Sequence, residues 1–286
     1  MDVHFWLLQV FNGMSYGALL FLLGSGLSLI FGVMRIVNLA HGSFFLLGGY
    51  VALSVIQLTG SWLLAIPIAA LAVAIIGVVM ERVFMRPLGG DHLRQVLLTF
   101  GFVLLFQQGA LDLWGGDNLF INPPQALAHS LVLGRYYLPL YRIFLMAVAA
   151  AIGVVLWWVL DRTRVGATVR ATVDDAQMAR GIGIDTSRVS MATFGLGALL
   201  AGLGGVIGGG FLGVYPGLDS DMLPLAFAVV IIGGMGSLAG AAIGSVVVGL
   251  LANFGQVLFP QLAYFTLYAP LVLLLAARPT GLFGRE

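Results

Sequence analysis

Few side chains in this 286-residue chain could carry out acid–base, nucleophilic or metal chemistry. There is no cysteine, so a disulfide framework and a thiolate metal site are excluded. His41 stands at the start of an apolar run, but no second His or carboxylate follows it at metal-ligand spacing. We find no nucleophile elbow and no paired carboxylates of the kind that hydrolases use. The sequence therefore predicts neither a catalytic nor a metal site, and it favours a hydrogen-bonded structural role for His41 over a proton relay.

The basic residues exclude two further classes of function. All 13 are arginine, whereas the glycine-rich ATP-binding loop uses a lysine on the phosphates. The chain is therefore not expected to bind ATP in such a loop, and no other cofactor is indicated. A net charge of +1 offers no electrostatic attraction for nucleic acid, so no nucleic-acid partner is predicted.

The elements that position these residues are apolar helices. The chain is 60% hydrophobic and 9% charged, whereas a soluble domain carries about 25% charged residues. Its apolar runs are long enough to cross a bilayer as helices, which takes about 20 residues each. We expect spans at about 6–31, 39–58, 62–80, 95–113, 141–160, 190–209 and 260–277, with an interrupted segment at 222–256. The predicted fold is an all-α integral membrane protein of about eight segments, forming one domain over residues 1–286.

Arginine-rich loops stay on the cytoplasmic side of a membrane, and they orient this chain. Most of the arginines lie in the loops 81–94 and 161–189, after the first span at Arg35, and near the C-terminus at Arg278 and Arg285. All of these fall on one side if the N-terminus is outside and the C-terminus is cytoplasmic. The stretches at about 115–140 and 210–221 then face outward. The segment 222–256 must then enter and leave at one face, as a pair of short helices or a re-entrant hairpin.

Ionisable residues are almost absent from the predicted spans. Among the acidic residues, only Asp112 falls within a span, near its outer end, and Asp219 and Asp221 fall in the outer turn 210–221. Proton-driven carriers need ionisable groups inside the membrane, so we expect either a passive pore or a part that is driven by another protein. A path without fixed charge suits a neutral or zwitterionic solute such as leucine, isoleucine, valine, urea or a short amide.

Charges of alternating sign gather in the loop 161–189, which is typical of a folded, solvated element. No Gly or Pro occurs within 168–180, so a short helix is expected there, with Asp174 and Asp175 towards its start and Arg180 at its end. The loop is either a solvated connection or a docking helix that a cytoplasmic motor grips.

Glycines four residues apart form two stripes in the C-terminal half of the chain. Small residues at this period let two helix backbones approach closely in lipid. The stripes include Gly204, Gly205, Gly208 and Gly209 in the first, and Gly236 and Gly240 in the second. They pack either inside one subunit or against a second membrane subunit.

Three blocks of the sequence resemble one family of transport proteins. They read "GLSLIFGVMRIVNLAHGSFFLLGGYVA" at 26–52, "RATVDDAQMARGIGIDTSRVSMATFGLGALLAGLGGVIGG" at 170–209, and "AFAVVIIGGMGSLAGAAIGSVVVG" at 226–249. In this order they resemble LivH-type permease subunits of branched-chain amino acid ABC importers, and the resemblance covers nearly the whole chain.

The resemblance implies a role for particular residues. It places Arg170, Ala171, Asp174, Asp175, Met178 and Ala179 at the contact of a cytoplasmic coupling helix with an ATPase subunit, followed by Gly183, Ile184, Arg188 and Val189. It places Asn38, Ala40, His41 and Gly42 at the entry to the second span. Two positions depart from the family pattern, because Asp185 stands where Asn is usual and Ser43 stands where many relatives have an acidic residue. The second departure bears on the solute, since this span could border the path.

The resemblance further implies alternating access in a bacterial inner membrane, without chemistry by this chain. Its expected partners are two ATP-binding cassette subunits that hold ATP and Mg, a second related permease, a periplasmic substrate-binding protein and membrane lipid. Three alternatives stay open: a permease of a urea or short-amide ABC importer, a self-sufficient channel for small neutral solutes, and an intramembrane enzyme, which would need a reactive constellation that we do not find.

Overall fold

The computed structural model describes residues 3–134, 136–278 and 280–283, and Arg285 lies outside them. Helices form most of it, as expected from the long apolar runs. The helices are α1 (Val3–Met34), α2 (His41–Thr59), α3 (Trp62–Val79), α4 (His92–Trp114), α5 (Leu140–Arg162), α6 (Arg164–Asp174), α7 (Ala176–Gly181), α8 (Thr186–Leu212), α9 (Leu218–Gly233), α10 (Leu238–Leu258) and α11 (Ala263–Ala277). A π-helical turn, Met80–Met85, and a short 3-10 turn, Arg86–Leu88, extend α3.

Within the described residues, eight helices are long and apolar enough to cross a membrane. They correspond to α1, α2, the extended α3, α4, α5, α8, α10 and the segment Pro260–Ala277 that contains α11. The prediction of an all-α integral membrane protein with about eight membrane segments is therefore confirmed. The one described sheet is an antiparallel hairpin of β1 (Ser130–Leu133) and β2 (Tyr136–Pro139) in the long loop before α5.

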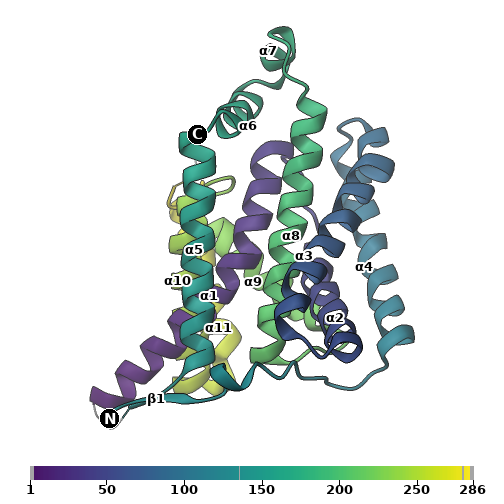
Figure 1. Ribbon diagram of the computed structural model, residues 1–286. Helices are drawn as coiled ribbons and strands as arrows, with labels where there is room; N and C mark the ends of the chain where they lie inside the picture. The colour runs from purple at the N-terminus through teal and green to yellow at the C-terminus, as the bar shows by residue number, and fades with distance from the viewer. Residues whose placement is uncertain (1–2, 135, 279, 284–286) are drawn as a thin grey trace.

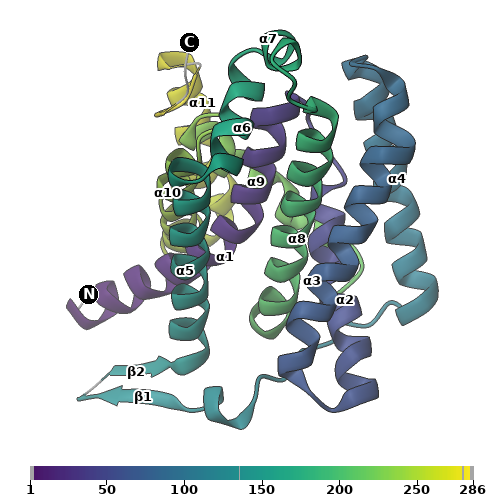
Figure 2. The same cartoon turned by 45° about the horizontal axis from the view of Figure 1, so that its top comes forward.

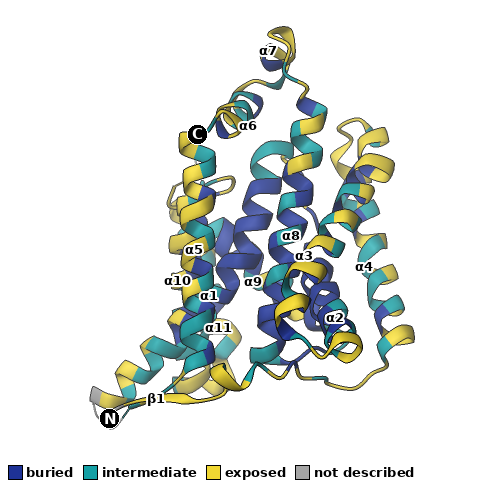
Figure 3. Cartoon of the chain, in the orientation of Figure 1, coloured by how far each residue is buried: buried dark blue, intermediate teal, exposed yellow. Residues whose placement is uncertain are grey.

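The bundle has two distinct ends, which Figures 1 and 2 show from two directions. One end, which we call the α7 end, carries α6 and the projecting α7. The other, which we call the hairpin end, carries β1 and the N-terminal part of α1. Burial increases toward α1 and α8 in the middle of the bundle, whereas α4 and α5 are largely exposed (Figure 3). This distribution fits a bundle that shows apolar side chains to lipid and packs its glycine-rich helices in the core.

The interrupted segment 222–256 forms two helices rather than one long span. The 16-residue α9 ends at a turn in which Gly234 and Gly236 adopt positive φ angles of 100° and 82°. The 21-residue α10 then begins, with Ser237 as its N-cap accepting a hydrogen bond from the Gly240 amide at 3.0 Å. An added Cβ on Gly32, near the end of α1, would lie 3.1 Å from Gly236, which places this turn toward the α7 end. The pair thus enters and leaves at the hairpin end, as the parity argument predicted.

Both glycine stripes make close contacts within this chain, although Gly236, predicted to pack helices, lies in the turn before α10 and not in a helix. A Cβ added to Gly205 would collide with the Phe45 carbonyl of α2, and one on Gly208 would lie 2.5 Å from the Phe45 ring. Gly204 also faces that ring, and Gly209 lies against Ile121. In the second stripe, Gly240 meets the Gly233 backbone, so α9 and α10 touch almost backbone to backbone.

Candidate functional site

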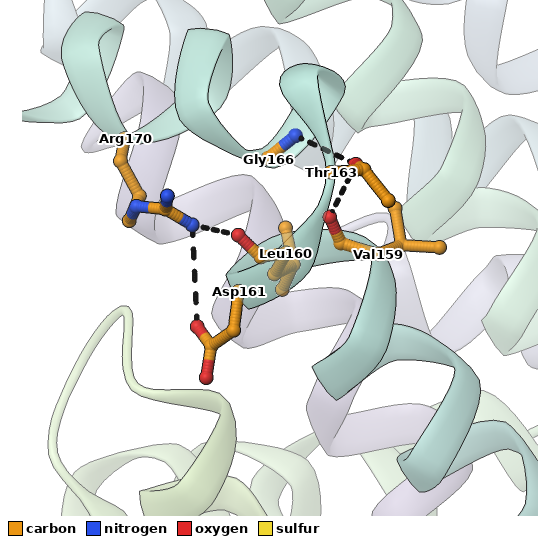
Figure 4. A network of polar contacts seen from close by, with 6 residues as sticks. All are labelled: Val159, Leu160, Asp161, Thr163, Gly166 and Arg170. Carbon is orange, nitrogen blue, oxygen red and sulfur yellow. Dashed lines mark hydrogen bonds and ion pairs between the residues drawn. The ribbon is translucent and has the colours of Figure 1, made fainter.

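The loop between α5 and α8 begins with a tight elbow at Thr163 (Figure 4). Thr163 caps α6, because its Oγ1 accepts a hydrogen bond from the Gly166 amide at 3.3 Å. The same hydroxyl donates to the Val159 carbonyl of α5 at 2.6 Å. Gly166 allows the close approach, since an added Cβ would collide with the Leu160 carbonyl. The direction of α6 relative to α5 is therefore set by contacts between residues close in the sequence.

Arg170 of α6 points back toward this elbow, as Figure 4 shows. Its Nη1 donates to the Leu160 carbonyl and lies 4.0 Å from Asp161 Oδ1. The guanidinium thereby satisfies a carbonyl at the end of α5, where helix carbonyls lack partners within the helix. Arg170 is half exposed, and its charged group holds α6 on α5.

The single helix predicted within 168–180 is wrong, because the structure has two helices with a break at Asp175. Asp175 caps α7, and its Oδ1 accepts hydrogen bonds from the amides of Gln177 at 2.8 Å and Met178 at 2.9 Å. An aspartate side chain competes for backbone amides in this way, so it favours a new helix start over the helix interior. Asp174 consequently lies at the end of α6 and not near the start of a helix.

A second aspartate begins α8. Asp185 Oδ1 accepts hydrogen bonds from the amides of Ser187 and Arg188, both at 3.1 Å, and its Oδ2 pairs with Arg188 Nε at 2.9 Å. Gly183 supports the preceding turn with a positive φ of 92°. Asparagine and aspartate both cap helices well, so Asp185 fills the place of the expected Asn without changing the local fold.

Exposed apolar side chains gather on α7, the element that projects farthest from the bundle (Figure 1). Met178 is 64% exposed and Ile182, directly after the helix, is 69% exposed. The two lie four residues apart, a spacing that brings side chains to the same side of a helix. Ala179, by contrast, is buried. An exposed apolar surface at the tip of a polar loop is typical of a protein-binding site.

The second site lies where the chain enters α2. Asn38 is buried and accepts a hydrogen bond from the Ala40 amide at 3.1 Å. His41 is also buried, with Nε2 2.9 Å from the Leu23 carbonyl in the middle of α1. The start of α2 therefore lies beside the middle of α1 and not beside its end. Gly42 completes this contact, because an added Cβ would lie 2.6 Å from the Asp219 carbonyl.

A buried carboxylate lies against the start of α2. Asp219, in the first turn of α9, is 2% exposed and accepts hydrogen bonds from Ser43 Oγ at 2.9 Å and Gln107 Nε2 at 3.0 Å. The expectation that Asp219 lies in an outer turn is therefore wrong, because Asp219 belongs to a helix and is buried. α9 begins at Leu218, four residues before the predicted apolar segment, and takes Asp219 into the bundle. Acidic residues just before an apolar run are a helix-start signal that could have indicated this.

A cavity of about 520 Å³ opens beside this carboxylate, between α4 and the start of α9. Its polar lining comes from Gln107 and Gln108 of α4 and from Ser220 of α9, and Leu104 and Leu111 line it on the apolar side. Gln107 Nε2 also donates to Ser220 Oγ at 2.9 Å, so one amide joins the wall of the cavity to the buried carboxylate. The sequence-based analysis missed Gln107 and Ser220, because nothing in their local pattern indicates that they meet.

Comparison with known proteins places this geometry in context. A family model described as "Branched-chain amino acid transport system / permease component" matches residues 9–276. The chain is 31% identical over 304 residues to the high-affinity branched-chain amino acid transport system permease protein BraD of Pseudomonas aeruginosa, covering 99% of this chain and 97% of that protein. It is 30% identical over 305 residues to LivH of Salmonella typhimurium, covering 98% and 96%. It is 26% identical over 286 residues to the permease protein LivM of Escherichia coli, covering 91% and 67%. No solved structure matches the chain.

Proposed function

Because the chain belongs to the family of permease components of branched-chain amino acid transport systems, we propose that it is driven by separate ATPase subunits and imports branched-chain or other neutral amino acids. The chain is a multi-pass membrane protein, with eight helices long and apolar enough to span a bilayer among its described residues. A transport permease moves its solute without making or breaking covalent bonds. ATP and Mg would be held by the partner subunits.

The observation that carries this proposal is the projecting loop of α6 and α7. A permease that pumps without an energy source of its own needs a surface on which another protein can push. Met178 and Ile182 offer such a surface at the tip of the loop, and the contacts of Thr163, Gly166 and Arg170 join it firmly to α5. A force on α7 would therefore reach the bundle through α5 and α8. A self-sufficient channel has no need of this element.

The proposed orientation places the α7 end in the cytoplasm and the hairpin end outside. The loop between α3 and α4 carries arginines and lies toward the α7 end, as does the end of α1 (Figure 1). The C-terminal residues Leu282 and Phe283 hydrogen-bond to Ile232 and Gly233 at the end of α9, which supports a cytoplasmic C-terminus. Arg142 belongs to the other end, but its guanidinium is used inside the bundle, 4.7 Å from the Phe211 ring.

The proposed partners follow from the same argument. Two ATP-binding cassette subunits would bind at α7, and a second permease would complete the membrane part; relatives named LivH and LivM, both permease proteins, support the latter. A periplasmic binding protein would deliver the solute at the hairpin end. Urea or a short amide is the alternative solute, because these molecules are also small and carry no net charge.

The test is gentle purification of the chain from native membranes, followed by identification of its partners and by uptake measurements in liposomes. We expect an ATP-binding subunit and a second permease to co-purify, and uptake of a branched-chain amino acid to require ATP and the binding protein. Vesicles without ATP provide the control. A chain that purifies alone and conducts a neutral solute without ATP would contradict the proposal, and the α6–α7 loop would then be a solvated connection.

A further inference from the structure

α9 is packed on most sides but has one open face. It lies against α1, α2, α10 and α11, and its buried residues face these helices. The residues of α9 that remain exposed or half-buried are Ser220, Asp221, Leu223, Pro224, Leu225, Phe227 and Ile231. Four of them, Ser220, Pro224, Phe227 and Ile231, are spaced by four, three and four residues, which places them on a single face of a helix. α4 borders one end of this face, where Gln107 Nε2 donates a hydrogen bond to Ser220 Oγ at 2.9 Å.

Two cavities lie along this face. The larger, of about 520 Å³, is at the start of α9 and has Gln107, Gln108 and Ser220 in its lining. The smaller, of about 270 Å³, is at the end of α9 and is apolar, with Phe227 and Ile231 in its lining. The face therefore changes from polar to apolar in the direction from the hairpin end to the α7 end. A molecule with a charged head and an apolar side chain meets suitable surroundings for both parts.

The polar cavity presents hydrogen-bond acceptors backed by a negative charge. Gln107 Nε2 donates to both carboxylate oxygens of Asp219 at 3.0 Å and to Ser220 Oγ. A carboxylate only accepts hydrogen bonds, so the amide nitrogen of Gln107 must face Asp219. Gln107 also lines the cavity, and its Oε1 can therefore accept a hydrogen bond from a molecule bound there.

The charge of Asp219 has no counter-ion in the described part of the chain. Its hydrogen-bond donors, Ser43 and Gln107, are uncharged, and the ion pairs among the described residues involve other carboxylates. A buried charge without an opposite charge produces a strong local potential, because the surroundings screen it poorly. Ionisable groups inside a membrane bundle are costly and mark solute or ion pathways. The cavity is therefore suited to a cationic group.

We infer that the cavity between α4 and α9 is a binding subsite for the ammonium group of a zwitterionic amino acid. Gln107 Oε1 accepts a hydrogen bond from the ammonium group, and Asp219 behind it supplies the attraction. The apolar side chain of the solute then lies toward Phe227 along the open face of α9. This inference rests on the proposed transport function and specifies where, and through which charge, the solute is recognised.

The absence of cysteine from the chain permits a direct test of the charge. Gln108→Cys places one thiol in the cavity wall and leaves the hydrogen bonds of Asp219 intact, since Gln108 bonds to Asp112. In the transporter purified with its partners, we compare the labelling rates with cationic aminoethyl and anionic sulfonatoethyl methanethiosulfonate. Met235→Cys, in the apolar cavity, is the matched control. Its labelling rates with the two reagents correct for the difference in their intrinsic reactivity. We expect about a tenfold preference for the cationic reagent at the polar cavity, and loss of most of it with Asp219→Asn.

Protection by solutes tests the ligand itself. L-leucine should slow labelling of Gln108→Cys, and Asp219→Asn should remove this protection, whereas urea should protect equally with either residue at 219. The inference stands only if both the reagent preference and the leucine protection depend on Asp219. An unchanged reagent preference in Asp219→Asn, or leucine protection that does not differ from that of urea, would overturn it.

The labelling experiment does not depend on transport. A failure of the proposed function appears as uptake without ATP or as purification without an ATPase, and neither outcome changes the charge in the cavity. Folding of the Asp219→Asn variant is checked by its labelling at Met235→Cys, which should match the parent rate. If Asp219→Asn leaves labelling at Met235→Cys unchanged but removes the preference for the cationic reagent at Gln108→Cys, the preference is due to the Asp219 carboxylate.

Discussion

Single carboxylates determine the shape of the loop that we propose to contact the ATPase. Asp175 and Asp185 cap α7 and α8, and Arg170 is turned toward α5. Side chains that the family resemblance placed at the ATPase contact thus have hydrogen bonds within the loop itself. Met178 differs from them, because its exposed side chain has an apolar surface and no polar partner to satisfy. Among these residues, the charged ones position the loop and the apolar one is available for binding.

Replacement of Met178 by aspartate should therefore separate the permease from its ATPase. A charge buried without a partner in an interface costs several kcal/mol, so we expect at least a tenfold loss of bound ATPase in pull-down experiments and a similar loss of ATP-driven uptake. Val165→Asp is the matched control, because Val165 is 65% exposed but lies on α6, away from the tip of the loop. Equal effects of the two variants would show that α7 is not the contact.

At the scale of helices, the packing of α2 against α8 depends on close contact between the two helix backbones. Phe45 of α2 lies over Gly204, Gly205 and Gly208 of α8, with no space for a side chain between the two backbones. In lipid, helices gain little from burying apolar surface, so close van der Waals contact is what holds them together. The same contact holds the start of α2 near Asp219, because α2 is a single rigid helix between His41 and Thr59.

Gly205→Ala should consequently destabilise the protein, since the added methyl group meets the Phe45 carbonyl, which belongs to a helix backbone and cannot move aside. We expect a loss of about 1–3 kcal/mol, seen as a lower midpoint of thermal unfolding in detergent. Gly101→Ala in α4 is the control, because nothing lies within 4 Å of the position that an added Cβ would occupy there. That variant should be neutral or slightly more stable, in line with the better helix propensity of alanine. Equal midpoints for the two variants would contradict the packing argument.

For the whole molecule, the two ends of the bundle differ in chemistry. The α7 end carries the charged loop, whereas the hairpin end carries β1, β2 and the part of the polar cavity that Pro216 and Gly217 line. With the α7 end in the cytoplasm, a solute arriving from outside meets the polar cavity first and the apolar part of the α9 face afterwards. The direction of import would then match the order in which the solute is recognised.

This orientation can be measured with single cysteines, since the chain has none. Tyr137→Cys in β2 should react with a membrane-impermeant maleimide on intact cells, because Tyr137 is 68% exposed at the hairpin end. Val165→Cys, similarly exposed on α6, should react only after the membrane is permeabilised. The two positions serve as controls for one another. The reverse pattern would invert the proposed topology and place α7 outside the reach of a cytoplasmic ATPase.

Composition and the lengths of the apolar runs were enough to establish the class of protein, the approximate spans and the paired helices at 222–256. They suffice because a bilayer demands about 20 apolar residues for each crossing and keeps arginine-rich loops on one side. The helix break at Asp175 was also open to sequence reasoning, since capping acts between residues two or three apart. The break was not predicted because residues 168–180 contain no Gly or Pro, which suggested one continuous helix.

The meeting of Ser43, Gln107 and Asp219, by contrast, is a property of the tertiary structure alone. Asp219 is more than 100 positions from either partner, and the three come together because α2 starts beside the middle of α1 and the first turn of α9 is buried against it. No local periodicity records such a contact, because each residue alone follows the pattern of its own helix. The glycine contacts that bring α2 and α8 together determine the placement of α2, and with it the charge that the proposed solute would meet.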